Sequence, residues 1–468
     1  MAAERITHVS IYRPGNGNWL REEVAMAFPE AFPVAPFRQE DRPGSGRGWF
    51  SWQGGRPAKG QGKKRPAGED GAGGALIFEQ QRLPGVTWIS GGKPERLAEE
   101  AMGWLASRFP RQPAIGNCHV FTVDGQGKAA LGGPAAVLRN KLARLWEPSL
   151  HGPPPAWNEW AGGASGGWRG MDSTGQSSAG QSSAGQSSVG QSSPGQNTAG
   201  QNMAGRNTVM QCFLVQGGLW CAVSQPDELA SPFPCGVSPL RQPEGAPSRS
   251  ALKLEESWLL SGWRPGVRET VIDLGAAPGG WSHACLKLGC RVMAVDNASL
   301  RLQHVEELPG ELTHLRADGL RFRPPASWLP VDWLLADMLI PPGVCLGLLK
   351  KWIGNGWMRR FVVNLKLPQR EPLAALAPVR EYLAGVPGLR WRMRQLYHDR
   401  REVTVMGAIT GGLKSPAGGD SAADKRRRTS KPKRRQPAGS TGKRSGDTGK
   451  RSGGTGKRSG EITRKPKA

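Results

Sequence analysis

The stretch Val271-Ile-Asp-Leu-Gly-Ala-Ala-Pro-Gly-Gly-Trp281 decides the fold of the C-terminal half of this chain. It begins with apolar residues typical of a buried strand and ends in a glycine-rich turn that opens a helix. In such a turn backbone N–H groups come close to a ligand, and a Cβ at Gly275, Gly279 or Gly280 would obstruct it. The spacing is Gly-x-x-Pro-Gly-Gly and lacks the G-x-G-x-x-G that a pyrophosphate requires. The turn therefore predicts a cofactor without phosphate groups and disfavours NAD.

Outward from this turn, residues 264–410 alternate apolar, strand-like runs with helix-like stretches. The runs that predict parallel strands are 270–274, 291–295, 312–316, 333–338 and 361–367. This pattern is typical of a parallel sheet covered by helices on both faces. The last two runs, 392–397 and 402–409, are separated by only four residues. That link is too short for a crossover, so the final strand is expected to be antiparallel. The prediction is an α/β, Rossmann-like fold with a mostly parallel sheet and an antiparallel last strand, which is the form of class I methyltransferases.

Three acidic residues follow the expected strands at the edge where ligands bind in open α/β sheets. Asp273 ends the first strand, where it is placed to receive an ammonium group of the ligand or to orient the turn through a water. Asp296 closes the next strand, 23 residues further on, where a carboxylate can accept both hydroxyls of a ribose. Asp318 follows the third strand and is placed to bind an adenine amino group. The three acids predict a cofactor that contains adenosine and an amino group.

The charge of the chain is strongly positive and unevenly distributed. The formal net charge is +25, from 63 Lys and Arg against 38 Asp and Glu. Residues 411–468 contain 18 of these basic residues and four of the acidic ones, in KRRR, KPKRR and three TGKRSG units. This composition predicts a disordered basic tail that binds phosphates without sequence preference. The positive charge of the remaining chain indicates a polyanionic partner, nucleic acid before a membrane surface.

Cysteine spacing and the lack of long apolar runs limit the cellular setting. The seven cysteines include no CxxC pair, which predicts reduced core thiols and neither a disulfide framework nor a zinc site. The first residues, MAAERITHVSIYRPG, lack the apolar run of a signal peptide. The most apolar later stretch, near residues 333–349, is interrupted by Asp337, Pro341 and Pro342. We expect a soluble, cytoplasmic monomer without a bound metal.

Seven strings between residues 246 and 405 carry a family resemblance. They are Ala246-Pro-Ser-Arg-Ser-Ala-Leu-Lys-Leu-Glu-Glu256, Asp273-Leu-Gly-Ala-Ala-Pro-Gly-Gly-Trp281, Ala294-Val-Asp-Asn297, Asp337-Met338, Asn364-Leu-Lys-Leu-Pro368, Leu396-Tyr-His-Asp-Arg400 and Glu402-Val-Thr-Val405. Together they resemble the RlmM-type 23S rRNA ribose 2′-O-methyltransferases of the FtsJ/RrmJ-like group. The resemblance implies S-adenosylmethionine as cofactor and a cytidine of 23S rRNA or its precursor as target. It implies cofactor contacts from Ser250, Asp273, Gly275, Ala277, Pro278, Gly279, Gly280, Trp281, Asp296, Asp318 and Asp337.

Composition and the resemblance together divide the chain into four parts. They are an α+β domain at 1–110 with a Gly-, Pro- and Lys/Arg-rich insertion at 38–75, a THUMP-like RNA-binding domain at 111–245, the methyltransferase domain at 246–410 and the basic tail at 411–468. Five-residue units such as SSAGQ repeat within 161–208 and have almost no burial capacity, which predicts a disordered insertion. The runs 209–215 and 219–223 predict a hairpin directly after it.

The same resemblance implies a catalytic tetrad of Lys253, Asp337, Lys366 and Glu402. Asp337 and Lys366 end the fourth and fifth expected strands, and Glu402 begins the antiparallel one, so all three should meet at one edge of the sheet. A ribose hydroxyl is a very weak acid, and a lysine can take its proton only when the lysine pKa is lowered. We expect Lys366 to be this base, with the like charge of Lys253 lowering its pKa. Asp337 would orient Lys366, and Glu402 would hold Lys253 and the hydroxyl.

Two other functions stay open on the sequence alone. One is 2′-O-methylation of another RNA, such as tRNA, and the other is a catalytically inactive RNA-binding factor for ribosome assembly that kept the fold. Retention of all four tetrad residues argues against the second. Methylation of a base nitrogen is disfavoured, because residues 337–342 lack the aromatic residue that stacks on a flipped base in such enzymes.

Overall fold

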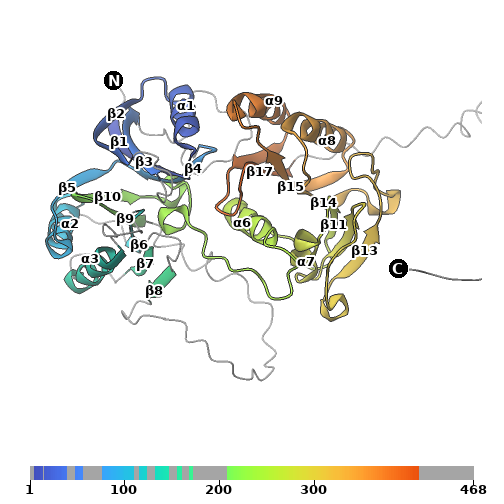
Figure 1. The fold of residues 1–468 in the computed structure, drawn as a ribbon, viewed down its shortest axis with the longest axis horizontal. Helices are drawn as coiled ribbons and strands as arrows, with labels where there is room; N and C mark the ends of the chain where they lie inside the picture. The colour runs from blue at the N-terminus through green and yellow to red at the C-terminus, as the bar shows by residue number, and fades with distance from the viewer. Residues whose placement is uncertain are drawn as a thin grey trace, which may run out of the picture. The chain divides into compact units, whose positions relative to one another are not determined.

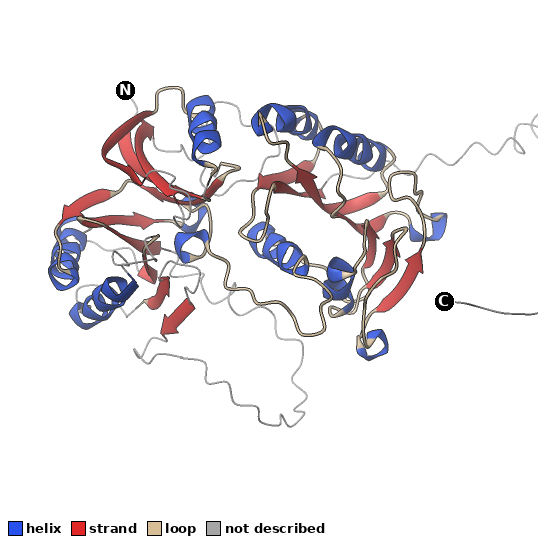
Figure 2. Ribbon diagram, in the orientation of Figure 1, coloured by secondary structure: helices blue, strands red, loops and turns tan. Residues whose placement is uncertain are grey.

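The described part of the chain contains three β-sheets with their helices (Figure 1; Figure 2). The computed structural model describes residues 5–13, 15–39, 48–55, 76–109, 115–123, 132–146, 155–160, 168–171 and 208–410. The pentapeptide repeat and the basic tail lie outside these residues. Among the helices that are described, none is both long and apolar enough to cross a membrane.

The N-terminal sheet is antiparallel and has the order β2-β3-β1-β4. Its elements are β1 (Arg5–Tyr12), α1 (Gly17–Ala27), β2 (Phe32–Gln39), β3 (Gly48–Gly55) and β4 (Glu79–Pro84). Tyr12 of β1 and Trp52 of β3 are buried in the same core as Leu20 of α1. The prediction that residues 38–75 are an insertion is therefore wrong for 48–55, which form a central strand of this sheet.

The second sheet has the order β5-β10-β9-β6-β7-β8 and is covered by two helices that pack against each other. Its elements are β5 (Thr87–Ser90), α2 (Pro94–Arg108), β6 (Ile115–Phe121), α3 (Gly132–Leu145), β7 (Ala156–Trp160), β8 (Trp168–Met171), β9 (Thr208–Val215) and β10 (Gly218–Ser224). β9 and β10 form the predicted hairpin. β5 pairs with β10 of this sheet and α2 packs on both strands, although the prediction places residues 87–108 in the first part.

The third sheet has the order β13-β12-β11-β14-β15-β17-β16. Its strands are β11 (Thr270–Leu274), β12 (Arg291–Val295), β13 (Glu311–Leu315), β14 (Val331–Ala336), β15 (Met358–Lys366), β16 (Leu389–Arg394) and β17 (Glu402–Ile409). The pairs from β13 to β15 are parallel, whereas β17 is antiparallel to both of its neighbours. This confirms the predicted class I methyltransferase fold. The strand order reverses beside β11, and ligands of open α/β sheets bind at such a point.

Helices cover both faces of the third sheet. Successive residues of its strands point to opposite faces and are buried on both, so each face needs a covering layer. On one face α6 (Ala251–Ser261) and α7 (Gly280–Leu286) pack on Val271, Trp333 and Leu335. On the other face α8 (Pro342–Gly354) and α9 (Pro372–Ala384) pack on Leu334 and Val363. The prediction of a helix between every pair of strands is wrong at two places, since β12, β13 and β14 are joined by loops whose helical content is limited to three-residue 3₁₀ turns.

All seven cysteines lie in described segments of the chain. Each of them is buried, and none forms a disulfide bond. This agrees with the prediction of reduced core thiols.

The N-terminal sheet contacts the loop between β16 and β17. The backbone N–H of Gln395 donates to Ile77 O at 2.9 Å, and the Gln80 side chain donates to Gln395 O at 2.9 Å. The Arg13 guanidinium donates to the carbonyl oxygen of Asp399 in the same loop. This loop leads into Glu402, so the N-terminal sheet helps to shape the segment in front of that residue.

Candidate active site

The four predicted tetrad side chains lie at the carboxyl edge of the third sheet. Asp337 directly follows β14, Lys366 is the last residue of β15, and Glu402 is the first residue of β17. Because β17 is antiparallel, its first residue faces the last residue of β15, and Lys366 and Glu402 are register partners. Lys253 is on α6, which packs on β17. Side chains from four separate segments therefore converge.

Each lysine of this tetrad contacts both carboxylates. Lys366 Nζ lies 2.7 Å from Asp337 Oδ1 and forms a second ion pair with Glu402. Lys253 Nζ lies 3.3 Å from Asp337 Oδ2 and is also paired with Glu402. The exposed fractions of these side chains run from 7% for Glu402 to 20% for Lys366, so the group is largely buried but reaches solvent. The expected contacts of Asp337 with Lys366 and of Glu402 with Lys253 are both present, and the crossed contacts are present as well, so the four charges alternate around a closed ring.

The alternating charges keep both carboxyl groups ionised. Burial alone would raise the pKa of Asp337, but the charges of Lys253 and Lys366 outweigh burial and lower it. In Glu402 the hydrogen bonds from the same two lysines likewise outweigh burial and lower the pKa. Both carboxylates are therefore available as acceptors at neutral pH.

The pKa of Lys366 is raised, contrary to the expectation from the sequence. Burial by itself would lower this pKa, but the carboxylates of Asp337 and Glu402 together outweigh it. Lys253 does not lower the pKa of Lys366 below its ordinary value, because Lys253 faces the same two acids. Lys366 is thus protonated at neutral pH, and a role as base requires that it lose this proton in the assembled complex.

Three buried polar residues next to the tetrad were missed by the sequence analysis. Asn364 Nδ2 donates to Asp337 Oδ1 at 2.9 Å, and Thr404 Oγ1 lies 2.7 Å from Asn364 Oδ1 and 3.0 Å from Asp399 Oδ2. The period of a strand is the signal that would have found two of them. Asn364 lies two residues before Lys366, and Thr404 lies two residues after Glu402, so both face the same side as the tetrad.

The turn between β11 and α7 has the backbone conformation that its glycines predict. Gly275 and Gly279 have φ angles of +73° and +112°, which residues with a Cβ rarely adopt. An ideal Cβ on Gly275 would lie 2.5 Å from Met338 Cγ. The atoms that a side chain would meet at Gly275 thus belong to the protein, and this glycine allows the turn to approach the segment after β14.

Three of the residues with an implied cofactor contact pack on one another where α6 and α7 begin. A Cβ on Gly280 would collide with the Ser250 hydroxyl. Trp281 is 2% exposed, and its indole N–H donates to Ser250 O at 2.8 Å. These contacts join the glycine turn to the start of the helix that carries Lys253.

Two further acids border the turn and accept backbone hydrogen bonds. Asp296 accepts from Ala277 N at 3.0 Å and from Ala298 N at 2.8 Å, one on each carboxylate oxygen. Asp318, whose side chain is 47% exposed, accepts from Leu320 N at 2.9 Å. A carboxylate has about four acceptor positions, so both acids can still accept a hydroxyl or an amino group.

Asp273 lies beneath the turn and is 1% exposed. Its Oδ2 accepts the Ser282 hydroxyl at 2.7 Å, which ties the end of β11 to α7. Burial raises the pKa of Asp273 to about 7. The hydrogen bond from Ser282 lowers this pKa, and the negative charge of Asp337 raises it. Of the two roles expected for Asp273, this packing favours the one in which it orients the turn.

The negative charge of the acids around the glycine turn indicates which kind of cofactor can bind there. Asp273, Asp296, Asp318 and Asp337 surround the glycine turn, and a phosphate group there would meet carboxylates on several sides. S-adenosylmethionine has no phosphate, carries an ammonium and a sulfonium, and offers hydroxyl and amino groups to carboxylates. The donor set therefore fits S-adenosylmethionine and not a dinucleotide.

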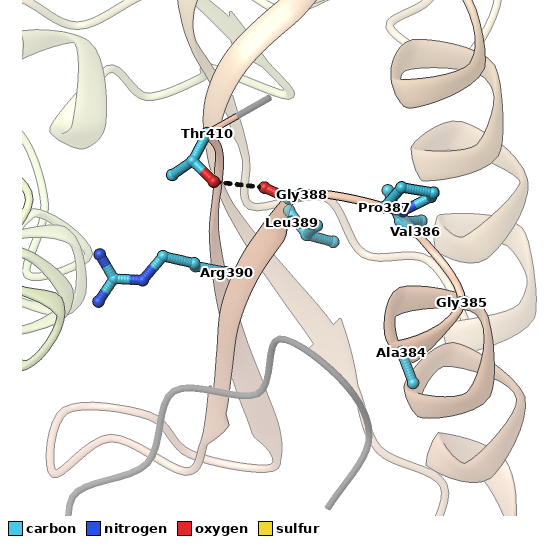
Figure 3. A pocket seen from close by; sticks show the side chains of 8 residues that line it. All are labelled: Ala384, Gly385, Val386, Pro387, Gly388, Leu389, Arg390 and Thr410. Carbon is cyan, nitrogen blue, oxygen red and sulfur yellow. Dashed lines mark hydrogen bonds between the residues drawn. The ribbon is translucent and has the colours of Figure 1, made fainter. Parts of the chain in front are cut away.

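A shallow cavity of about 310 Å³ lies at the opposite edge of the third sheet. It is lined by residues 384–390 and Thr410, whose hydroxyl donates to Gly388 O at 2.8 Å (Figure 3). Leu389 and Ile409 pair at this end, whereas Glu402 begins β17 at the other end. The cavity is therefore separate from the tetrad.

Comparisons with known proteins match residues 246–346 to the FtsJ-like methyltransferase family. The chain is 45% identical over 186 residues to the ribosomal RNA large subunit methyltransferase M of Alkalilimnicola ehrlichii, which covers 37% of this chain and 49% of the relative. It is 42% identical over 204 residues to the protein of the same name from Methylococcus capsulatus, covering 41% and 55%. The chain thus spans about half the length of the curated relatives it matches.

Some of the solved structures that resemble this chain are more distant from it. The magnesium protoporphyrin IX methyltransferase of Synechocystis PCC 6803 has a TM-score of 0.26 and 17% identity, covering 35% of this chain and 79% of that chain. A similarity at this level carries no functional argument. The family match includes the glycine turn, the strands from β11 to β14, Lys253 and Asp337. Residues 246–346 are thus similar to FtsJ-like methyltransferases, and the acids around their glycine turn fit S-adenosylmethionine as the cofactor.

Proposed function

We propose that this chain methylates a ribose 2′-hydroxyl, that of a cytidine in 23S rRNA or its precursor, with S-adenosylmethionine as methyl donor. The observation that carries the proposal is the closed ring of Lys253, Asp337, Lys366 and Glu402 at the carboxyl edge of the sheet. The names of the relatives support a ribosomal RNA target. We also propose that the protein acts in the cytoplasm as a monomer, and that its N-terminal region and basic tail bind RNA.

The reaction requires an alcohol to be held, deprotonated and aligned with the methyl donor. S-adenosylmethionine, when bound, supplies a methyl group on a positively charged sulfur. Lys366 Nζ takes the proton of the ribose hydroxyl after losing its own, and Lys253 stabilises the negative charge that develops on the oxygen. Asp337 and Glu402 hold both amines in place through the ion pairs described above.

The raised pKa of Lys366 predicts a rate that increases with pH. Below the pKa of Lys366 the neutral fraction grows about tenfold per pH unit, and Asp337 and Glu402 stay ionised because their pKa values are lowered. We expect log kcat at saturating cofactor to rise between about pH 7 and 9 with a slope near 1. Single-turnover methyl transfer from labelled S-adenosylmethionine measures this profile. A flat profile would show that Lys366 is not the base.

Asp273 predicts a pH dependence of cofactor binding itself. Its pKa of about 7 means that it gains a proton as the pH falls through neutrality, whereas the cofactor carries positive charge that favours the ionised acid. Affinity for S-adenosylmethionine should therefore rise with pH up to about 7 and then level off, with proton release on binding at pH 6. Calorimetry in buffers of different ionisation enthalpy measures both the affinity and the number of protons released. Asp273→Asn should bind more weakly and without this pH dependence, and an unchanged dependence in this variant would assign it to another group.

The substrate is tested by mapping ribose methylation in RNA by mass spectrometry. The proposal expects one 23S rRNA cytidine to be unmethylated in cells that lack this protein and to be restored by the wild-type chain. Loss of a methylation in tRNA instead would support the tRNA alternative. Restoration by a Lys366→Met variant would support the non-catalytic assembly factor.

A further inference from the structure

A line of hydrogen bonds runs from the catalytic Asp337 into the core of the domain. Asn364 Nδ2 donates to Asp337 Oδ1 at 2.9 Å, and the Thr404 hydroxyl lies 2.7 Å from Asn364 Oδ1. On its other side the Thr404 hydroxyl lies 3.2 and 3.0 Å from the two carboxyl oxygens of Asp399. Asn364, Thr404 and Asp399 are each at most 1% exposed. Buried polar groups need hydrogen-bond partners, and these three residues find them in one another and in Asp337.

The sheet register places this line directly behind the tetrad. Asn364 and Thr404 are register partners on β15 and β17, and the pair Lys366 and Glu402 lies two residues further along on the same face. Asp399 belongs to the loop in front of β17, and its backbone N–H donates to Leu396 O. The pair of Lys366 and Glu402 is therefore backed by the buried pair of Asn364 and Thr404.

The number of protons available to these groups decides which group donates and which accepts in each hydrogen bond. Asp337 is an ionised acceptor, so the amide of Asn364 must present its NH₂ group to Asp337 and its oxygen to Thr404. A hydroxyl has one proton, and the Thr404 proton is needed for the Asn364 oxygen. The contact between Thr404 and Asp399 must then obtain its proton from Asp399. Only a protonated Asp399 satisfies every group.

We propose that Asp399, in its neutral form, Thr404 and Asn364 form a positioning relay that orients Asp337 for catalysis. The relay rests on the proposed function, because it acts on the tetrad that this function uses. Asp399 donates to Thr404, Thr404 donates to Asn364, and Asn364 donates to Asp337. None of the three contacts the substrate.

The surroundings of Asp399 agree with a neutral carboxyl group. Burial raises the pKa of Asp399 well above its ordinary range, and the charge of Glu402 raises it further. The N–H of Leu396 and the charge of Lys253 oppose this rise, and the charge of Glu256 on α6 adds to it. The net direction is toward the protonated acid.

The relay also connects Asp337 to the N-terminal sheet. The carbonyl oxygen of Asp399 accepts a hydrogen bond from Arg13, and Asp399 Oδ2 accepts from Leu396 N at 2.8 Å. These contacts fix the loop that presents the carboxyl group to Thr404. A residue far from the tetrad in sequence thus takes part in setting the orientation of Asp337.

The first test compares Thr404→Val with Thr404→Ser in single-turnover methyl transfer. Valine has nearly the shape of threonine without the hydroxyl, whereas serine keeps the hydroxyl. We expect Thr404→Val to lower kcat roughly 10- to 100-fold, because Asn364 is then no longer held with its NH₂ group toward the charged Asp337, with little change in KM for the cofactor. Thr404→Ser should keep most of the activity.

The pH profile separates positioning from a general loss of structure. Without the directed N–H of Asn364, the Asp337 carboxylate attracts the Lys366 proton more strongly. The rising limb of log kcat should therefore move to higher pH in Thr404→Val and stay in place in Thr404→Ser. If Thr404→Val instead loosened the ion pairs of Lys366 with Asp337 and Glu402, the pKa of Lys366 would fall and the rising limb would move to lower pH, which would contradict the relay. Equal kcat and equal profiles in the two variants would overturn the relay.

The second test needs no catalysis and examines the proton on Asp399. Infrared difference spectra of the wild-type chain and Asp399→Asn at pH 7 should contain the band of a protonated carboxyl group that the variant lacks. The asparagine can still donate to Thr404, so this variant should keep activity that Asp399→Ala loses. If the band is absent, the relay is wrong whatever the substrate. If the wild type methylates no RNA, the proposed function fails while the infrared result still decides the proton.

Discussion

Replacing Lys366 by methionine is expected to lower kcat for ribose methylation by about 10²- to 10⁴-fold, the contribution of a general base. Methionine fills much of the space of the lysine stem but has no amine to accept the hydroxyl proton. Lys253 keeps its ion pairs with Asp337 and Glu402 in this variant, and its proposed role is to stabilise the charge that develops on the oxygen and not to take the proton. Binding of S-adenosylmethionine should change little, since the glycine turn and its acids are untouched.

Two companion variants show whether the loss is chemical. Lys366→Arg keeps the positive charge and both ion pairs, yet an arginine does not release its proton at these pH values, so it should be nearly as inactive as Lys366→Met. Lys287→Ala removes an exposed lysine from the end of α7 and should behave as wild type. Circular dichroism and thermal melting confirm that each variant is folded. Substantial activity in Lys366→Arg would mean that Lys366 acts through its charge and not as a base.

The sequence was sufficient to predict the site residues that lie at the ends of strands. Asp337, Lys366 and Glu402 each stand where an apolar run ends or begins, and a parallel sheet with an antiparallel last strand brings such residues to one edge. The pKa of Lys366 could not be predicted in the same way. It depends on whether acids or a like charge lie nearest, and this is decided by distances of a few ångströms.

Other features escaped prediction for different physical reasons. Strand β3 lies between glycine- and proline-rich segments whose composition is typical of loops, so its buried Trp49 and Trp52 gave too weak a signal. The buried Asp399 reads in sequence as one more charged loop residue. Its carboxyl group contacts Thr404 on β17 and its backbone carbonyl accepts from Arg13 on a distant segment, and no local pattern reports these contacts.

Replacing Glu79 by glutamine is expected to destabilise the N-terminal sheet by about 3–5 kcal/mol, the cost of removing one partner from a buried ion pair. Glu79 and Arg82 on β4 are 0% and 1% exposed, with Arg82 Nη2 2.6 Å from Glu79 Oε2. Glu79 also accepts the Ser10 hydroxyl at 2.5 Å. Glutamine preserves the shape but removes the negative charge that Glu79 supplies to the guanidinium of Arg82 in a core that excludes water.

The neighbouring Arg394 makes this loss larger. Its side chain is buried and donates to Glu79 O, and burial lowers its pKa to about 10 while the charge of Glu79 raises it. Removing the charge of Glu79 therefore leaves two buried guanidinium groups less compensated.

Thermal unfolding measures the effect, with an expected fall in Tm on the order of 10 °C. Glu100→Gln is the matched control, because it breaks the exposed pair with Arg96 on α2 and should cost less than about 0.5 kcal/mol. Arg394 ends β16 and precedes the loop that carries Asp399 toward Glu402, so the melting of Glu79→Gln should be accompanied by loss of methyl transfer at lower temperature than in wild type. Unfolding of the N-terminal sheet with full activity retained would show that the tetrad is assembled by the methyltransferase domain alone.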